Sequence, residues 1–261
     1  MKVNPELISS YKELPSGKKI YFASDFHLGI PSKEESKERE RKVIKWLEYV
    51  SKDAQAIFLL GDVFDFWFEY KTVVPKGFIR FQGKLAELKD RSIDIHLFTG
   101  NHDLWMKGYF SEELDIPVHH NPVVLKIGQK KLFIGHGDGL GPGDQKFKMV
   151  KKVFTNPLAK WLFKWIHPDI GVALANYWSK KSRLDPDEEK FDGEENERLL
   201  QYCKQVSKVK PHDYYVFGHR HLPLELSVGD SSTYFNLGEW ISQCNYLEFD
   251  GHQALLKSFE D

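Results

Sequence analysis

The sequence contains little cysteine and no long apolar run, and each absence excludes a class of protein. Two cysteines in 261 residues, Cys203 and Cys244, cannot form the disulfide framework of a small secreted protein. No segment approaches the roughly 18 apolar residues of a membrane-spanning helix, and the N-terminal residues lack the apolar core of a signal peptide. We therefore expect a cytoplasmic protein with reduced thiols, whose contact with any membrane is peripheral.

The chain also has almost no net charge. Lys and Arg number 37 and Asp and Glu 38, which gives −1 with neutral histidines. Because a nucleic-acid-binding protein usually carries a basic excess, this balance predicts no nucleic-acid partner. The content of 41% hydrophobic and 29% charged residues is typical of a globular enzyme. We expect residues 1–261 to form a single domain.

The first hundred residues alternate between strand-like and helix-like patterns. Three short apolar runs, 20–23, 56–60 and 93–98, each end at polar residues or glycine. Between them lie two segments with apolar residues at helical spacing, and a capping box formed by Ser32 and Glu35 begins the first of these. This alternation predicts a parallel sheet with right-handed crossovers.

In the second half of the chain the pattern changes to consecutive strands. Segments 123–127 and 131–134 predict a hairpin, and 214–217 predicts a further strand. Turn signals at 229–230 and 250–251 indicate two later hairpins. We expect a layered α/β domain whose second sheet is built largely from the C-terminal hairpins.

Residues 143–183 interrupt this pattern as a basic and aromatic insertion. They hold nine Lys or Arg against two Asp, and seven aromatic residues that include Trp161, Trp165 and Trp178. We expect residues 143–200 to form a helical cap beside the functional site. Its apolar side chains would shelter a lipid, and its cations would meet phosphates or an anionic membrane surface. Ordinary packing of amphipathic helices is the alternative explanation for the aromatic residues.

The ends of the predicted strands carry metal-ligating side chains. In open α/β sheets, ligands bind beyond the carboxyl ends of the strands. Residues two apart in an extended chain point the same way, so Asp25 with His27, and His219 with His221, are spaced to reach one ion together. The candidate ligands are Asp25, His27, Asp62, Asn101, His136, His219 and His221.

Seven such donors indicate two metal ions. Mixed carboxylate, amide and imidazole donors suit manganese, iron or zinc and not calcium. The set is too large for one tetrahedral site, but it fits two ions that share a bridging carboxylate. Each motif alone is ordinary loop chemistry, whereas the occurrence of all of them in order at strand ends is improbable by chance.

This ordered set resembles the calcineurin-like metallophosphoesterase superfamily, and the resemblance extends over nearly the whole chain. It implies a four-layer α/β/β/α sandwich and a water or hydroxide between two ions as the nucleophile. His102 would face the scissile phosphate, where it stabilises charge or protonates the leaving oxygen, and Asp103 would orient His102. The ligands implied are Asp25, His27, Asp62 and His221 for one ion, and Asp62, Asn101, His136 and His219 for the other.

Within that superfamily the chain is similar to the UDP-2,3-diacylglucosamine diphosphatase family of lipid A synthesis. The similarity rests on Ser-Asp-x-His-Leu-Gly at 24–29, Gly-Asp-Val-Phe-Asp-Phe-Trp at 61–67 and His-Gly-Asp-Gly-Leu at 136–140. The chain departs from the family pattern with His102 where Arg is usual and Arg183 where Asn is usual. The substrate-binding residues that the resemblance suggests are Asn101, His102, Asp144, Ser179, Arg183 and His219.

The function implied is that of a pyrophosphohydrolase that cleaves UDP-2,3-diacylglucosamine into 2,3-diacylglucosamine 1-phosphate and UMP. It would use two divalent ions, with manganese expected first and iron or zinc as alternatives. Its partners would be the glycolipid nucleotide and, peripherally, the cytoplasmic face of the inner membrane; no oligomeric state is predicted. A phosphodiesterase or phosphatase acting on a nucleotide or phosphoprotein is the alternative. A non-catalytic scaffold of the same fold is the third reading, and it would not need all seven ligands.

Overall fold

The first of two sheets contains the parallel strands expected from the N-terminal half. The computed structural model describes residues 7–143, 145–182 and 190–260. The strand order in this sheet is β12-β11-β2-β3-β4-β5. The predicted parallel centre is confirmed, and the last hairpin of the chain adds two antiparallel strands beside it. The bounds are β2 Lys19–Ala23, β3 Ala54–Leu60, β4 Asp94–Phe98, β5 Val118–His119, β11 Asn245–Phe249 and β12 Ala254–Ser258.

Helices α1 (Lys33–Val50), α2 (Ile79–Asp90) and α3 (Tyr109–Leu114) cover the outer face of this sheet. The predicted capping box begins α1, because the Ser32 hydroxyl accepts a hydrogen bond from the backbone N–H of Glu35 and donates one to its carboxylate. Trp46 of α1 and Phe81 of α2 both pack edge-on against Phe26. This packing anchors the loop after β2, which carries the first candidate metal ligands.

The second sheet has the order β1-β6-β7-β8-β10-β9, and α7 (Arg198–Val209) covers its outer face. The prediction for this sheet was correct only in part, because the hairpin β11–β12 joins the first sheet instead. There Leu247 pairs with Phe22, and all of β11 is buried. The remaining bounds are β1 Leu7–Tyr11, β6 Val123–Ile127, β7 Lys130–Gly135, β8 Tyr214–Phe217, β9 Pro223–Val228 and β10 Ser232–Leu237.

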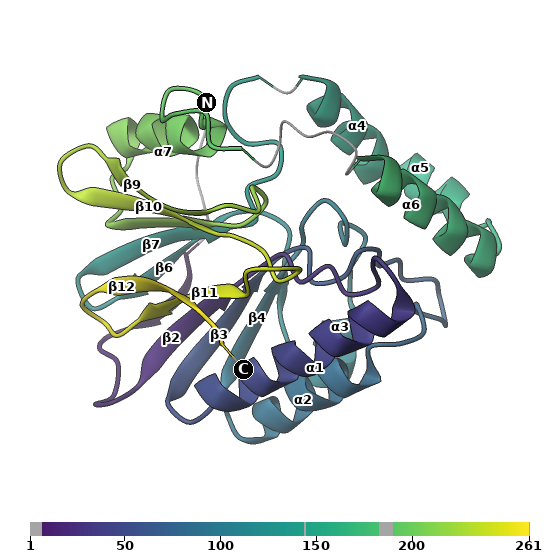
Figure 1. Cartoon of the computed structure of the whole chain (residues 1–261), viewed down its shortest axis with the longest axis horizontal. Coiled ribbons are helices and arrows are strands. Elements are labelled where there is room, and N and C mark those ends of the chain that lie inside the picture. Colours follow the sequence, from purple (N-terminus) through teal and green to yellow (C-terminus); the bar gives the residue numbers. More distant parts are fainter. Residues whose placement is uncertain (1–6, 144, 183–189, 261) are drawn as a thin grey trace.

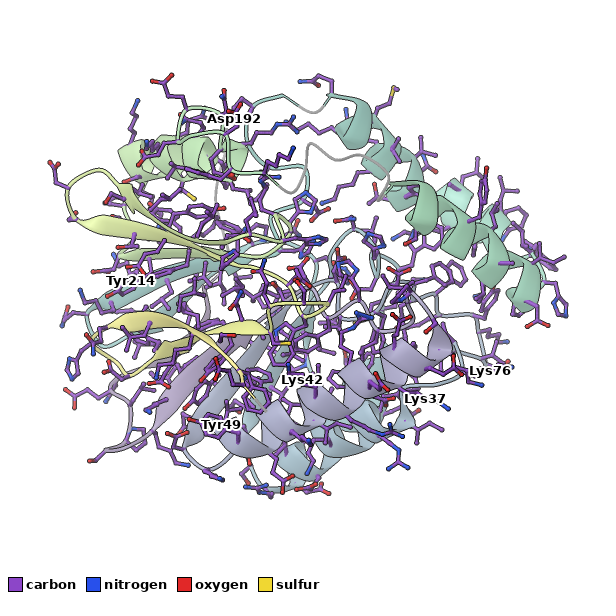
Figure 2. All side chains as sticks on the ribbon, viewed as in Figure 1. Lys37, Lys42, Tyr49, Lys76, Asp192 and Tyr214 are labelled. Atoms are coloured by element: carbon purple, nitrogen blue, oxygen red, sulfur yellow. The ribbon has the colours of Figure 1, made fainter. Side chains whose placement is uncertain are left out.

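The two sheets pack face to face through an apolar layer, which gives the predicted α/β/β/α sandwich (Figure 1). Phe22 and Phe58 of the first sheet stack at 5.3 Å between ring centroids, and both belong to this layer. Tyr214, labelled in Figure 2, lies on β8 of one sheet with its ring 5.7 Å from that of Phe249 on β11 of the other. The layer fixes both sheets relative to each other, so their strand ends meet at one edge.

Three helices stand apart from the sandwich as a cap: α4 (Gln145–Thr155), α5 (Pro157–Phe163) and α6 (Pro168–Ser182) (Figure 1). The cap was expected to span residues 143–200, but Leu199 and Leu200 belong to α7 and are buried against the second sheet. The cap helices that the structure describes therefore end at Ser182. The indole N–H of Trp105 donates to the carbonyl of Phe154 at 2.7 Å, which fixes α4 to the sandwich.

A half-buried histidine pair in the first sheet predicts acid sensitivity. Nδ1 of His96 on β4 lies 3.0 Å from Nε2 of His119 on β5. The pKa of each ring is lowered to about 4, mainly by burial, and at His96 the neighbouring His119 contributes to this shift. In the unfolded chain a histidine has a pKa of about 6.5. The unfolded state therefore binds more protons between these values, and the free energy of unfolding falls as the pH drops from about 6.5 to 4.

We expect His96→Phe to weaken this pH dependence. The new ring would stack on Phe58, as His96 does at 4.6 Å, and one titrating group would be removed. Urea unfolding at a series of pH values should give a shallower fall in the free energy of unfolding than in the unchanged protein. An identical slope in both proteins would show that His96 makes no contribution.

Candidate metal centre

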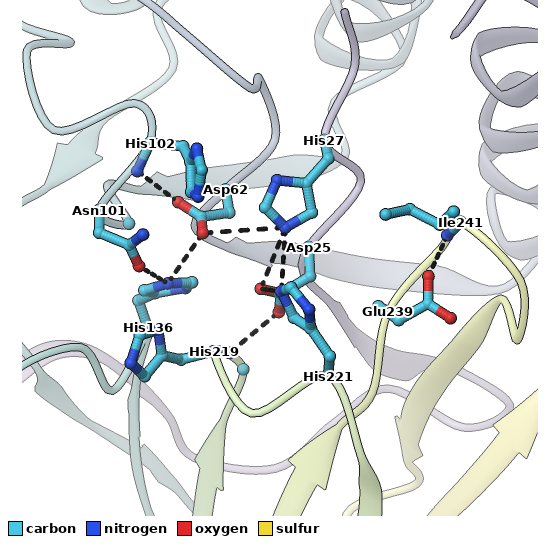
Figure 3. A network of polar contacts seen from close by, with 12 residues as sticks. Asp25, His27, Asp62, Asn101, His102, His136, His219, His221, Glu239 and Ile241 are labelled. Atoms are coloured by element: carbon cyan, nitrogen blue, oxygen red, sulfur yellow. Dashed lines mark hydrogen bonds and ion pairs between the residues drawn. The ribbon is translucent and has the colours of Figure 1, made fainter. Parts of the chain in front are cut away.

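Five strands from both sheets end at one point, and each carries a predicted ligand beyond its last residue (Figure 3). The first sheet contributes Asp25 and His27 after β2, Asp62 after β3 and Asn101 after β4. The second sheet contributes His136 after β7, and His219 and His221 after β8. The structure thus brings together all seven predicted ligands, although they come from positions up to 196 residues apart along the chain.

The loops that carry these ligands stay paired after the strands have ended. The backbone N–H of Asp25 donates to Gly61 O at 3.0 Å, and that of His27 donates to Asp62 O at 2.9 Å. The N–H of Trp240 donates in turn to Asp25 O at 3.1 Å, so the loop after β10 also supports the site. These bonds fix the ligand-bearing backbone independently of any bound ion.

Five of the seven ligands lie in the left-handed backbone region that non-glycine residues rarely adopt. Their φ angles are 57° for Asp25, 44° for His27, 50° for Asp62, 72° for His219 and 54° for His221. Each such conformation costs on the order of 1–3 kcal/mol and persists only where the surroundings enforce it. Backbone strain of this kind concentrates at functional sites, which agrees with the placement of the ligands.

The first ligand group consists of Asp25, His27 and His221. Nε2 of His27 lies 3.0 Å from Nε2 of His221 and 3.8 Å from Oδ1 of Asp25. The distance from His221 Nε2 to the same Asp25 oxygen is 3.3 Å. Two imidazole nitrogens and a carboxylate oxygen thus converge on one point that a single cation can occupy.

The second group lies around His136. Its Nε2 is 3.4 Å from Oδ2 of Asp62 and 3.3 Å from Oδ1 of Asn101. The same Asp62 oxygen lies 3.9 Å from Nε2 of His27, so this carboxylate stands between the two groups, as a bridging ligand would. The His219 ring packs against that of His136 with centroids 5.2 Å apart.

The protonation states in this cluster fit divalent cations. The carbonyl of Leu60, 2.8 Å from His136 Nδ1, can only accept a hydrogen bond, so Nδ1 carries a proton and Nε2 faces the cluster. Although burial lowers it, the Asp62 carboxylate raises the pKa of His136 to about 10, so a cation bound at Nε2 would displace a proton. Oδ1 of Asp25 is buried without a hydrogen-bond partner among the described residues. Convergent lone pairs and an unpartnered carboxylate oxygen are what a bound cation satisfies.

Burial and neighbouring charges set the protonation states of the other ligands. Burial lowers the pKa of His27 well below its usual value and that of His219 to about 4, so both rings are neutral near pH 7 and able to bind a metal. Burial alone would raise the pKa of the Asp62 carboxyl, but the neighbouring histidines, His136 above all, hold it well below the usual range. Asp62 is therefore ionised.

The surroundings of His102 differ from the expectation. The two oxygens of Asp103 accept hydrogen bonds from the backbone N–H groups of Gly100 at 2.7 Å and Val63 at 2.9 Å, and so join two ligand loops. The carboxylate beside the His102 ring belongs to Asp65, with Oδ1 3.5 Å from Nδ1. Asp103 thus orients the backbone on either side of the site, and Asp65 takes the place that we expected for Asp103.

Asp65 was not among the predicted site residues. It lies three positions after Asp62, within the segment 61–67 that supported the family resemblance, but nothing in the sequence shows that its side chain turns toward the site. Its side chain also accepts a hydrogen bond from the Ser179 hydroxyl on α6 at 2.8 Å. Ser179 is one of the predicted substrate-binding residues; Asp144 and Arg183 lie outside the described residues.

A cavity of about 390 Å³ separates the metal centre from the cap. Asn101, His102 and Asp65 form its polar end, where the predicted ligands lie. The rest is mainly apolar and combines Trp105 of the sandwich with side chains of all three cap helices. Its lining residues are Asp65, Phe66, Asn101, His102, Leu104, Trp105, Val150, Lys151, Phe154, Phe163, Ala175 and Ser179.

The chain is similar to a known family and to curated relatives over most of its length. A family model described as calcineurin-like phosphoesterase matches residues 18–223. A protein of Porphyromonas gingivalis named UDP-2,3-diacylglucosamine hydrolase is 38% identical over 263 residues, covering 93% of this chain and 98% of its own. A Vibrio vulnificus protein of the same name is 25% identical over 91% of this chain and 97% of its own. Among solved structures, Yfce, a phosphoesterase from E. coli, shows 17% identity and a TM-score of 0.40 over 88% of this chain and 87% of its own.

Two glycine substitutions test how closely the ligand loops approach each other. A Cβ on Gly100 would sit directly against the Asp62 carboxylate and 2.7 Å from its backbone nitrogen. We therefore expect Gly100→Ala to displace Asp62 and to lower metal content and hydrolysis by at least about 10-fold, since changes to the groups that support metal ligands typically cost about 10–100-fold.

The matched control is Gly83→Ala within α2, where a Cβ meets nothing within 4 Å. This change should leave metal content unaltered and stabilise the fold by about 0.5–1 kcal/mol, because alanine favours a helix interior over glycine. Full metal content in Gly100→Ala, measured by elemental analysis, would show that the approach of the two loops is not needed.

Proposed function

Because the chain belongs to the calcineurin-like phosphoesterase family, we propose that it is a metal-dependent hydrolase that cleaves the diphosphate bond of UDP-2,3-diacylglucosamine, yielding 2,3-diacylglucosamine 1-phosphate and UMP. The substrate follows the name shared by the relatives that match nearly the full length of the chain. We propose two divalent ions, manganese first, held by Asp25, His27, Asp62 and His221 and by Asp62, Asn101, His136 and His219.

In the proposed hydrolysis, the bound ions and His102 have different roles. When bound, two divalent ions supply positive charge against the phosphate and lower the pKa of an attacking water toward 7. The backbone N–H of His102 donates to Oδ1 of Asp62 at 2.8 Å, so the His102 ring is fixed beside the expected bridging carboxylate. From there it is placed to stabilise charge on the phosphate or to protonate the leaving oxygen.

The mainly apolar lining of the cavity is the structural observation that supports a lipid substrate. It begins at Asn101 and His102, where the phosphate would lie, and continues as a mainly apolar space under the cap. A nucleotide or a phosphoprotein would not require such a lining, whereas acyl chains would bury it. Burying acyl carbon against side chains such as Phe154 and Phe163 contributes roughly 25 cal/mol per Å² of apolar surface.

A direct comparison of substrates tests the proposal. With manganese supplied, kcat/KM for UDP-2,3-diacylglucosamine should exceed that for UDP-N-acetylglucosamine, which lacks long acyl chains, by at least about 100-fold. A loss of two buried chains worth several kcal/mol would produce such a ratio. Equal rates on both substrates and on a generic phosphodiester would instead favour the alternative of a nucleotide phosphodiesterase.

Filling the cavity should abolish this preference. Ala175 on α6 is 8% exposed and lines the cavity, so Ala175→Phe would occupy the space of an acyl chain. We expect a 10–100-fold loss in kcat/KM for the lipid substrate, which corresponds to about 1.5–3 kcal/mol of lost apolar burial. Hydrolysis of a small phosphodiester should persist.

Ala173→Phe on the same helix is the control, because Ala173 is exposed and does not line the cavity. It should leave both activities intact. If Ala175→Phe leaves lipid hydrolysis unchanged, the acyl chains do not enter this cavity.

We also propose that the outer face of the cap docks on an anionic membrane surface. A lipid-binding role inside the cap would require Trp161 and Trp165 to line the cavity, but they do not, and their side chains are 54% and 74% exposed. Met149, Val153, Leu158 and Leu162 on the cap helices are also exposed, and Lys152 and Lys164 are neighbours of Val153 and Trp165 in the sequence. Exposed aromatic and apolar side chains interspersed with cations are typical of interfacial helices. Among the residues that the structure describes, no helix is long and apolar enough to cross a membrane.

Vesicle binding tests the docking surface. Trp161→Ser combined with Trp165→Ser should reduce co-sedimentation with phosphatidylglycerol vesicles at least several-fold and leave hydrolysis of a small phosphodiester unchanged. Ile79→Ser and Val209→Ser, both 78% exposed on α2 and α7, are matched controls that should bind as the unchanged protein does. Equal vesicle binding by all variants would contradict docking through the cap.

A further inference from the structure

The loop after β8 supplies one ring to each ligand group. Nε2 of His221 lies 3.0 Å from Nε2 of His27 in the first group, and the His219 ring packs 5.2 Å from that of His136 in the second (Figure 3). Both loop histidines have left-handed backbone, with φ angles of 54° at His221 and 72° at His219. Because such conformations persist only where the surroundings enforce them, the contacts that hold this loop also determine where the two rings lie.

Hydrogen bonds from three other segments fix the first residues of the loop. The N–H of Gly218 donates to His136 O at 2.9 Å, and the carbonyl of Gly218 accepts a hydrogen bond from the side-chain amide of Asn236 on β10. The N–H of His219 donates to Oδ2 of Asp25 at 3.0 Å. Arg220, which separates the two histidines, is held through its side chain.

The Arg220 guanidinium donates two hydrogen bonds to the segment that leads into α7. Nε donates to Oε2 of Glu197 at 3.2 Å, and Nη2 donates to the carbonyl of Lys190 at 3.2 Å. The Glu197 side chain is 1% exposed and that of Arg220 is 18% exposed, so the ion pair is largely removed from water. Removing one partner of a buried pair leaves an uncompensated charge, so this link between the loop and α7 is costly to break.

Glu197 stands at the N-cap of α7 but does not cap the helix with its side chain. What the structure shows instead is the ion pair with Arg220. The next residues of α7 approach the other ligand loop of the second sheet, since a Cβ on Gly137, which follows His136, would meet Leu199 at 2.9 Å. The start of α7 therefore contacts the loops that carry the histidines of this sheet.

We propose that Arg220 and Glu197 are positioning residues for the metal centre. Their ion pair holds the loop between His219 and His221 against the start of α7, and thereby keeps one ring in each ligand group. In this role neither side chain binds an ion or the substrate. The inference rests on the proposed metal centre and not on the identity of the lipid substrate.

The test measures manganese binding in the absence of any substrate. Arg220→Met removes the guanidinium and leaves the buried Glu197 carboxylate without this partner. The variant should raise the dissociation constant for manganese by roughly 10–100-fold, as changes to groups that support metal ligands do. The metal-free variant should also melt at a lower temperature than the unchanged protein. Arg220→Lys, which keeps the charge, should recover part of the lost affinity.

A double variant, Arg220→Met with Glu197→Met, separates positioning from folding. Replacing both members of a buried ion pair by apolar side chains often restores stability, so the metal-free double variant should melt at a higher temperature than Arg220→Met alone. Its manganese affinity should stay as low as that of Arg220→Met, because the hydrogen bonds of the guanidinium are still missing. If manganese affinity recovered together with the melting temperature, the pair would act only through folding and the proposal would be wrong.

Lys204→Met is the matched control. Lys204 forms an ion pair with Glu194 at 3.2 Å, which also joins α7 to the segment before it, but these side chains are 35% and 51% exposed. This variant should bind manganese as the unchanged protein does. An equal loss of affinity in Lys204→Met and Arg220→Met, or unchanged affinity in a folded Arg220→Met variant, would overturn the positioning role alone. Failure of the unchanged protein to bind two ions would overturn the proposed function with it.

Discussion

The structure depends on the burial of two carboxylates and several imidazoles at a single point. Asp25 and Asp62 are 0% and 1% exposed, and a buried charge is tolerated only where partners compensate for the lost water. Here the histidines from the other strand ends supply that compensation, and divalent ions would complete it. The paired loops, the left-handed backbone at five ligands and the close approach of Gly100 to Asp62 are all consequences of bringing these groups together.

The sandwich provides the candidate metal ligands, and the cap provides part of the apolar cavity. Both sheets are needed for the chemistry, because the ligands follow β2, β3 and β4 of one sheet and β7 and β8 of the other. The cap helices close one side of the apolar cavity, and we propose that they provide the selectivity for the lipid substrate. Asp65 lies at the boundary, where one oxygen accepts a hydrogen bond from Ser179 of the cap and the other lies 3.5 Å from Nδ1 of both His27 and His102.

Local signals predicted much of the fold and nearly all of the residues that converge at the candidate metal centre. The capping box at Ser32 and the short apolar runs depend on neighbouring residues, and the ligand motifs directly follow strands that such runs define. Features that depend on tertiary contacts, such as sheet membership and side-chain orientation, could not be predicted. The sequence cannot show which sheet receives the β11–β12 hairpin, nor whether Asp65 or Asp103 faces the ring of His102. It also cannot show that Trp161 points outward whereas Phe163, two residues later, is buried against the sandwich.

The central claim is that the buried cluster holds two ions with Asp62 between them. Anomalous X-ray diffraction from crystals grown with manganese tests this most directly, because it locates each ion without reference to activity. The account predicts two anomalous peaks, one beside Asp25, His27 and His221 and one beside Asn101, His136 and His219, with the Asp62 carboxylate touching both. A single peak, or two peaks that the Asp62 carboxylate does not join, would contradict it.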